Sequence, residues 1–207
     1  MKESVKSIFD ELLARRPELK VCRVEIEKAF EILVRSFRSG GKALVCGNGG
    51  SAADAEHICG ELLKKFKKPR PLPAEVAARL RPELAARLEG GLGAVSLASM
   101  SGFISAFAND VEWECAFAQQ VLALARPEDV LIALSTSGNS ANCVAAAEVA
   151  RAKGGAAIAL TGRAESRLSE VCDVAVRVPE TETFKVQELH LPVYHFLCAQ
   201  LEQELYA

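Results

Sequence analysis

Side chains that can move protons or bind metals stand in two separate parts of the sequence. His57 and Glu61 are four residues apart, so on a helix they share one face. Gln187 and His195 lie near the end of the chain. A histidine–carboxylate pair joined by a second imidazole and an amide would satisfy a borderline metal such as zinc, and it could also carry acid–base chemistry. On spacing alone, His57 and Glu61 are equally well explained as an ordinary surface pair.

The second pair poses a geometric difficulty. On one straight helix, Gln187 and His195 would be separated by roughly 12 Å of rise. Three interpretations stay open: Pro192 kinks the helix between them, Gln187 precedes the regular helix, or the two residues serve different sites. His190, the remaining histidine, is expected to be a packing or supporting residue, although its spacing also permits a ligand.

A glycine-rich turn, Gly47-Asn48-Gly49-Gly50-Ser51, follows the apolar run 43–46 and precedes an Ala-rich helical stretch. Strand, glycine turn and helix N-terminus together predict an anion site, because glycine lets backbone N–H groups approach an oxyanion and the helix dipole favours negative charge. Gly47, Gly49 and Ala52 also match the dinucleotide pattern. That pattern needs an acidic residue after the second strand, and 97–99 holds Leu-Ala-Ser, which argues against a dinucleotide.

A second polar turn, 135–140, reads Ser-Thr-Ser-Gly-Asn-Ser after the apolar run 130–134. Hydroxyls at a helix N-terminus suit a phosphate dianion without Lys or Arg. Helix capping would need one such hydroxyl, whereas this turn supplies four, so phosphate binding is the stronger interpretation. The hydroxyls belong to Ser135, Thr136, Ser137 and Ser140.

Apolar runs alternate with helical patterns along the chain, which predicts an α/β fold with a five-stranded parallel sheet flanked by helices. Both polar turns would then meet at the carboxyl edge of the sheet. We expect a single domain, 1–207, that begins with a helical segment, 1–40. The predicted strands are 43–46, 93–97, 130–134, 156–160 and 174–178; the predicted helices are 3–16, about 26–37, 113–125, 141–153, 163–171 and 185–204, with an exposed helix at 74–89 that Pro82 splits.

The composition excludes several classes of protein. A net charge of −2 gives no general reason to expect nucleic acid or an anionic membrane as a partner. Seven scattered cysteines without a CxxC pair indicate reduced, buried thiols in a cytoplasmic protein. No stretch reaches the length of a membrane span. The basic run 64–71 is interpreted as a solvated helix end and turn, with one or two cations at the substrate phosphate as the alternative.

These motifs resemble those of the bacterial phosphoheptose isomerases, a family with the sugar isomerase (SIS) domain. The resemblance covers the chain from about residue 20 onward. The serine turn marks only the broad SIS class, and the histidine, carboxylate and amide set is more specific. Segment 67–92 departs from the pattern and is interpreted as an insertion. The matching motifs are 47–51, His57 with Glu61, Asn109-Asp110, 135–140, and Gln187-Glu188 with His195.

The resemblance implies a three-layer SIS domain and an aldose–ketose isomerase that interconverts sedoheptulose 7-phosphate and D-glycero-D-manno-heptose 7-phosphate through an enediol. Glu61 would be the general base and His195 the complementary acid or base. The family also implies a homotetramer with sites at subunit interfaces. Zinc would be held by His57, Glu61, Gln187 and His195, and the sugar phosphate by Asn48, Gly49, Gly50, Ser51, Asn109, Asp110, Ser135, Thr136, Ser137, Ser140 and Gln187.

Two other functions stay open. One is a non-catalytic SIS protein that binds sugar phosphates for a transcription regulator or partners a replication initiator; the four candidate zinc ligands favour an enzyme. The other is an isomerase of a different sugar phosphate, whose pocket the segment 67–92 would reshape.

Overall fold

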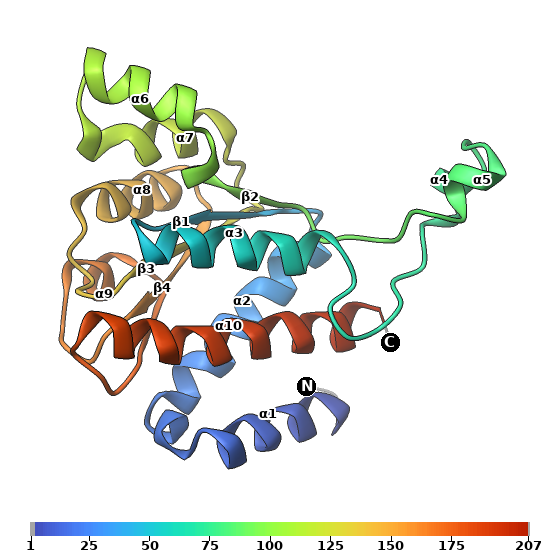
Figure 1. Ribbon diagram of the computed structural model, residues 1–207, viewed down its shortest axis with the longest axis horizontal. Coiled ribbons are helices and arrows are strands. Elements are labelled where there is room, and N and C mark those ends of the chain that lie inside the picture. The colour runs from blue at the N-terminus through green and yellow to red at the C-terminus, as the bar shows by residue number, and fades with distance from the viewer. Residues whose placement is uncertain (1–2, 207) are drawn as a thin grey trace.

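A computed structural model describes residues 3–206, with side chains from Ile8 onward. Within them, five parallel strands form one sheet in the order β2-β1-β3-β4-β5 (Figure 1). The first strand therefore lies between the second and the third, which makes the β1/β3 boundary the point where the strand order reverses. The strands are β1 (Ala43–Cys46), β2 (Ala94–Ser96), β3 (Val130–Ser135), β4 (Ala156–Thr161) and β5 (Val174–Arg177).

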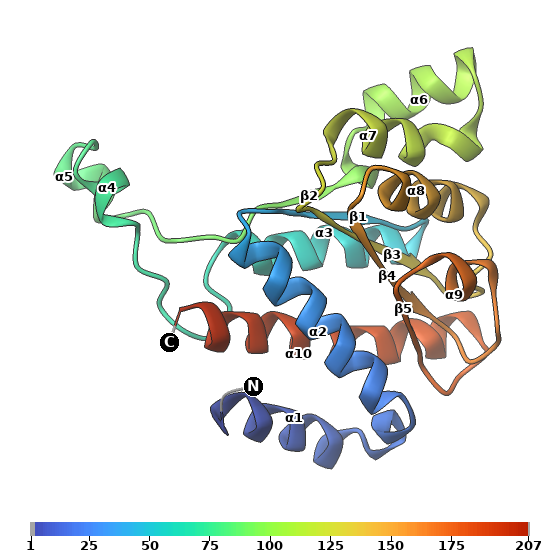
Figure 2. The same ribbon diagram turned by 180° about the vertical axis from the view of Figure 1, so that it is seen from behind.

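Helices cover both faces of this sheet, as the sequence predicts (Figures 1 and 2). One face carries α2 (Arg23–Arg38), α3 (Gly50–Leu63) and α10 (Thr183–Leu205), with α1 (Glu3–Arg15) packed outside α10. The opposite face carries α6 (Ser101–Asp110), α7 (Ala116–Leu124), α8 (Ala141–Ala152) and α9 (Arg167–Val171). Short 3-10 turns, Pro17–Cys22, Leu97–Ser99 and Trp113–Cys115, precede α2, α6 and α7.

Alternate strand residues enter two separate cores, because successive side chains of a strand point to opposite faces. Ala43 and Val45 join the core beneath α2, α3 and α10. Leu44 and Cys46 join the core beneath α7 and α8, where alanines allow close packing. All seven cysteines are free thiols, as expected, and five are buried, whereas Cys115 and Cys172 are partly exposed. Among the described residues, no helix has both the length and the apolarity that crossing a membrane requires.

The last helix continues through Pro192 as one 23-residue element. Proline cannot donate to the carbonyl four residues earlier, so it frees the oxygen of Glu188. Arg16 donates to that oxygen at 3.4 Å, which ties the turn after α1 to the middle of α10. Gln187 therefore lies inside the regular helix, and the hypothesis that it precedes the helix is wrong.

The middle of segment 67–92 forms an arm that stands away from the sheet and carries α4 (Ala74–Ala77) and α5 (Pro82–Ala85) (Figure 1), whereas Arg70 and Leu92 near its ends are buried. The predicted exposed helix at 74–89 is thus two short pieces, split at Pro82. The predicted helix 163–171 is also shorter. Ser166 caps it in a capping box with Ser169, so regular helix begins only at Arg167.

Candidate active site

The two polar turns meet at the carboxyl edge of the sheet. β1 pairs directly with β3, so the glycine loop (47–51) and the serine loop (135–140) leave neighbouring strands. An amide pair joins them: Asn48 and Asn142 each donate to the other's side-chain oxygen at 2.9 Å. The predicted juxtaposition of the two loops is therefore observed, and Asn142 is a linking residue that the sequence did not single out.

The glycine loop turns sharply into α3. A Cβ at Gly47 would lie 2.5 Å from the backbone oxygen of Ser51, so glycine is needed there for close approach. Gly49 has a φ of 56°, a left-handed conformation that also favours glycine. The backbone N–H groups of Ser51 and Ala52 donate to the oxygens of Asn48 and Gly49 at 3.0 Å, and the dipole of α3 favours an anion beside this turn.

The serine loop is held by its own hydroxyls. Ser135 Oγ and Ser140 Oγ lie 2.8 Å apart, and Ser137 Oγ accepts from the backbone N–H of Asn139 at 3.1 Å. Ser140 occupies the N-cap position of α8, yet its side chain makes no capping bond among the described residues. Capping therefore does not account for these hydroxyls, which agrees with the phosphate interpretation.

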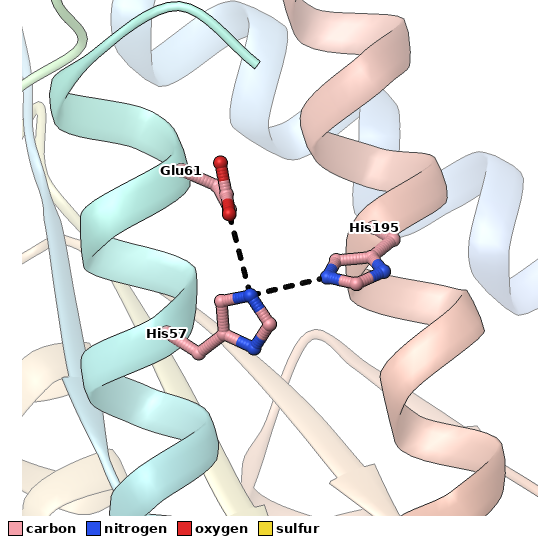
Figure 3. Close-up of side chains that lie close together, drawn as sticks. All are labelled: His57, Glu61 and His195. Atoms are coloured by element: carbon pink, nitrogen blue, oxygen red, sulfur yellow. Dashed lines mark hydrogen bonds and ion pairs between the residues drawn. The ribbon is translucent and has the colours of Figure 1, made fainter. Parts of the chain in front are cut away.

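His57 and Glu61 of α3 and His195 of α10 form one cluster (Figure 3). His57 Nε2 lies 3.3 Å from Glu61 Oε1 and 3.3 Å from His195 Nε2. The pair on α3 follows from the four-residue spacing, whereas His195 joins it because α10 packs alongside α3. The cluster lies on the α3–α10 face of the sheet.

A chain of hydrogen bonds supports the cluster from behind. Tyr194 Oη lies 3.0 Å from His57 Nδ1 and 3.0 Å from Asp54 Oδ1. This arrangement orients the His57 ring and directs Nε2 toward Glu61 and His195. Sequence reasoning missed Asp54 and Tyr194. Asp54 precedes His57 by three residues on the same helical face, which is a readable signal, but the role of Tyr194 depends on the packing of α10.

The electrostatics of the cluster favour an ionised base beside a neutral imidazole. Burial would raise the pKa of the Glu61 carboxyl, but Lys64, 2.9 Å away, and His57 outweigh burial and lower the pKa. Burial and then His57 lower the pKa of His195. At neutral pH, Glu61 is thus ionised and can accept a proton, although its lowered pKa makes it a weaker base, and His195 can donate or accept one.

The donor set fits a zinc ion. Within the described residues, one nitrogen or oxygen of His57, Glu61 and His195 each lies within 4.8 Å of the others. Two histidines and a glutamate are a common catalytic zinc set that leaves a coordination position open. Ligand bonds of about 2.0 Å in a tetrahedron put donor atoms about 3.3 Å apart, and the two separations from His57 Nε2 are 3.3 Å.

Within one chain, Gln187 lies away from the cluster of His57, Glu61 and His195. A Cβ at Gly50 would meet Gln187 Nε2 at 2.6 Å, so the amide covers the first turn of α3. His57 is seven residues further along α3, about 10 Å of rise. Asn109 and Asp110 are exposed at the end of α6, where the Asn109 amide donates to Asp110 at 2.9 Å. The structure therefore does not bring Gln187, Asn109 or Asp110 to the cluster.

A hollow of about 490 Å³ separates the glycine loop from α6, with Trp113 and Phe117 in its wall. Its position beside Gly49 and Asn48 suits a ligand that contacts the loop backbone. A second hollow of about 520 Å³ lies at the opposite, amino edge of the strands, near Arg35 and Gly155. Ligands of open parallel sheets bind at the carboxyl edge, so the hollow beside the glycine loop suits a ligand of that loop, whereas His195 lines a separate hollow of about 390 Å³.

Comparison with known proteins gives consistent matches. Residues 9–162 match the SIS domain family. The phosphoheptose isomerase of Rhodospirillum rubrum is 41% identical over 185 residues, which are 89% of this chain and 88% of the relative. That of Helicobacter hepaticus is 36% identical over 204 residues, 99% of this chain and 94% of the relative. A solved phosphoheptose isomerase from Francisella tularensis superposes with a TM-score of 0.77 at 30% identity, covering 98% of this chain and 100% of that one.

Proposed function

We propose that this chain converts sedoheptulose 7-phosphate to D-glycero-D-manno-heptose 7-phosphate. The proposal starts from the family: the chain belongs to the SIS domain family and is an isomerase of the phosphoheptose isomerase type. One observation carries the proposal: ligand atoms of Glu61 on α3 and of His195 on α10 lie within 4.8 Å of each other and of His57 (Figure 3). The two loops proposed to bind the phosphate lie at the other end of α3. An aldose–ketose exchange needs this combination, because a proton moves between adjacent carbons while the distant phosphate stays anchored.

The roles follow from the chemistry of each group. Glu61 takes a proton from C1 of the ketose and returns it to C2 of the resulting enediol. His195 moves the proton between the two oxygens, for which a neutral imidazole beside a second ring nitrogen is suited. Tyr194 and Asp54 keep the His57 ring in the orientation that faces both. These groups act on one end of the sugar.

The glycine loop and the serine loop bind the phosphate of the substrate in this proposal. Asn48, Gly49, Gly50 and Ser51 supply the N-terminus of α3, and the hydroxyls of 135–140 supply further donors. Binding energy at the phosphate holds the reacting carbons in place for proton transfer. In this proposal Asn109 and Asp110 contact the substrate from a second subunit, since the single chain leaves them exposed away from the cluster.

His57, Glu61 and His195 would hold zinc, which when bound would polarise the sugar carbonyl and stabilise negative charge on oxygen. The fourth donor would be Gln187 of a second copy in a homotetramer. The support is that Gln187 of the same chain packs on Gly50, about 10 Å of helix rise from His57.

The test is a coupled assay of sedoheptulose 7-phosphate isomerisation, run with and without added zinc, for the wild type and Glu61→Gln. The amide keeps the shape of the carboxylate but cannot accept the proton, so kcat is expected to fall about 10²- to 10⁴-fold while KM stays similar. A Glu83→Gln variant on the arm, where the carboxylate is exposed, is the matched control.

Each negative outcome has a meaning. Full activity of Glu61→Gln would remove Glu61 as the base. No turnover by zinc-loaded wild type, with turnover of another sugar phosphate, would replace the substrate but keep the reaction. Binding of sugar phosphates without turnover of any of them would favour a non-catalytic SIS protein.

A further inference from the structure

A fully buried ion pair lies just beyond the end of α3. Arg70 is 1% exposed and Glu202 is not exposed, and Arg70 Nε donates to Glu202 Oε1 at 2.8 Å. Glu202 also accepts from three successive backbone N–H groups, of Phe66, Lys67 and Lys68, at 2.7–2.8 Å. One carboxylate of α10 thus fixes the whole turn that leaves α3.

The Arg70 guanidinium closes the C-terminus of α3. Its two terminal nitrogens donate to the backbone oxygens of Leu62, at 2.5 Å, and of Glu61, at 3.1 Å. Helix C-termini leave carbonyl oxygens without intrahelical partners, and a cation there interacts favourably with the helix dipole. The last turn of α3 contains no Lys or Arg of its own, so Arg70 supplies that charge from outside the helix.

These contacts connect the ion pair to the helices that carry both reacting groups. Arg70 holds the backbone of Glu61 itself. Its partner Glu202 follows His195 on α10 by seven residues, two helical turns, and so lies on the same face of that helix. The pair therefore links the α3 end that presents Glu61 to the helix that presents His195.

We propose that Arg70, through Glu202, is a positioning residue that holds Glu61 and His195 in the register their reaction requires. The proposal rests on the function proposed above. It explains the choice of residue: a guanidinium offers a rigid planar fork that can reach one carboxylate and two carbonyls together, which an ammonium cannot match. It also gives a reason to bury two charges, since buried ion pairs are poor sources of stability and in some proteins fix a specific geometry instead.

The proposal can be tested because the phosphate loops and Arg70 lie at opposite ends of α3. The loops lie at the N-terminus of α3, and Arg70 acts at its C-terminus. Loss of Arg70 should therefore impair proton transfer without impairing phosphate anchoring. A side chain that merely stabilised the fold would lower the melting temperature and leave kcat of the folded enzyme unchanged.

The experiment compares Arg70→Lys, Arg70→Met and Glu202→Gln with wild type, each as the full chain. We expect kcat to fall about 10- to 100-fold with KM within about threefold of wild type. The affinity of the metal-free protein for zinc alone, measured by calorimetry, should fall about 10-fold or more, because the ligands lose their support. Arg70→Lys should regain melting temperature but not kcat. Arg79→Met, at an exposed arginine of the arm, should change none of these.

The outcomes separate the two proposals. Folded Arg70 variants with wild-type kcat and wild-type zinc affinity would overturn the positioning role. If Arg70→Met does not fold, the same comparison is decided by Arg70→Lys and Glu202→Gln. If wild type does not isomerise sedoheptulose 7-phosphate, the function proposed above fails, and zinc affinity still reports whether Arg70 positions the cluster.

Discussion

The glycine loop and the serine loop have the same place in the fold but keep their shapes by different means. Each follows a strand, contains one glycine with positive φ and begins a helix. At Gly138 an added Cβ would lie 2.1 Å from Ser166 Oγ, so the serine loop is packed against the segment before α9. At Gly49 an added Cβ would meet none of the described atoms within 4 Å.

This contrast separates two uses of glycine. Hydrogen bonds within the protein fix the shape of the serine loop. The backbone oxygen of Gly138 accepts from the N–H of Leu168, the Asn139 side-chain oxygen accepts from the N–H of Arg167, and the hydroxyls of Ser135 and Ser140 bond to each other. In the glycine loop, Asn48 forms hydrogen bonds with Asn142 of α8 and Gln187 packs on Gly50, but the space beside Gly49 is open among the described residues. Gly138 is therefore needed for packing, whereas Gly49 leaves room beside the backbone for a ligand.

The largest effect is expected for Gly138→Ala. The methyl group would strain a backbone with φ of 69° and collide with the Ser166 side chain. Strain and overpacking together should lower the free energy of unfolding by about 2–5 kcal/mol. Urea unfolding measures this loss, and KM for the sugar phosphate should rise in parallel because the hydroxyls are displaced.

Gly102→Ala, in a helix of the same face with open space around its Cβ, is the control. A free energy of unfolding of Gly138→Ala within about 0.5 kcal/mol of wild type, the ordinary range of surface substitutions, would show that packing at Gly138 does not fix the shape of the serine loop.

Acid should lower the stability of the fold through His190. His190 is fully buried, and burial lowers its pKa to about 4, partly offset by the backbone of Thr161 at the end of β4. The unfolded chain binds the proton below about pH 6.5, whereas the folded protein resists it down to about 4. Stability should therefore fall by up to about 3 kcal/mol as the pH drops through that window.

His190→Leu should remove most of this slope in denaturant titrations at several pH values. Carboxylates whose pKa values are lowered, such as Asp129 and Glu202, lose their contribution only at lower pH and so do not mimic it. His195→Asn, at a less buried ring, should keep most of the slope. An unchanged slope in His190→Leu would mean that His190 is not the group that titrates.

The sequence predicts most of the fold because its strands are buried on both faces and read as unbroken apolar runs. It predicts His57 with Glu61 because four residues make one helical turn. It does not show that Gln187 stays with Gly50, which depends on how α10 lies along α3. It also misjudges Arg70. The basic run 64–71 is solvated at its lysines, but Arg70 is buried because its partner comes from 132 residues away.

The smallest loss of stability is expected for Gly49→Ala. Among the described residues no atom lies within 4 Å of the new methyl group, so the cost is that of the positive-φ backbone alone, about 1–3 kcal/mol. The methyl group would, however, occupy the space through which backbone N–H groups reach the phosphate. Urea unfolding should therefore show a small change while KM rises about tenfold or more, unlike Gly138→Ala, where both change together. An unaltered KM would mean that the phosphate does not approach the glycine loop at Gly49, and the serine loop would then hold the anion without it.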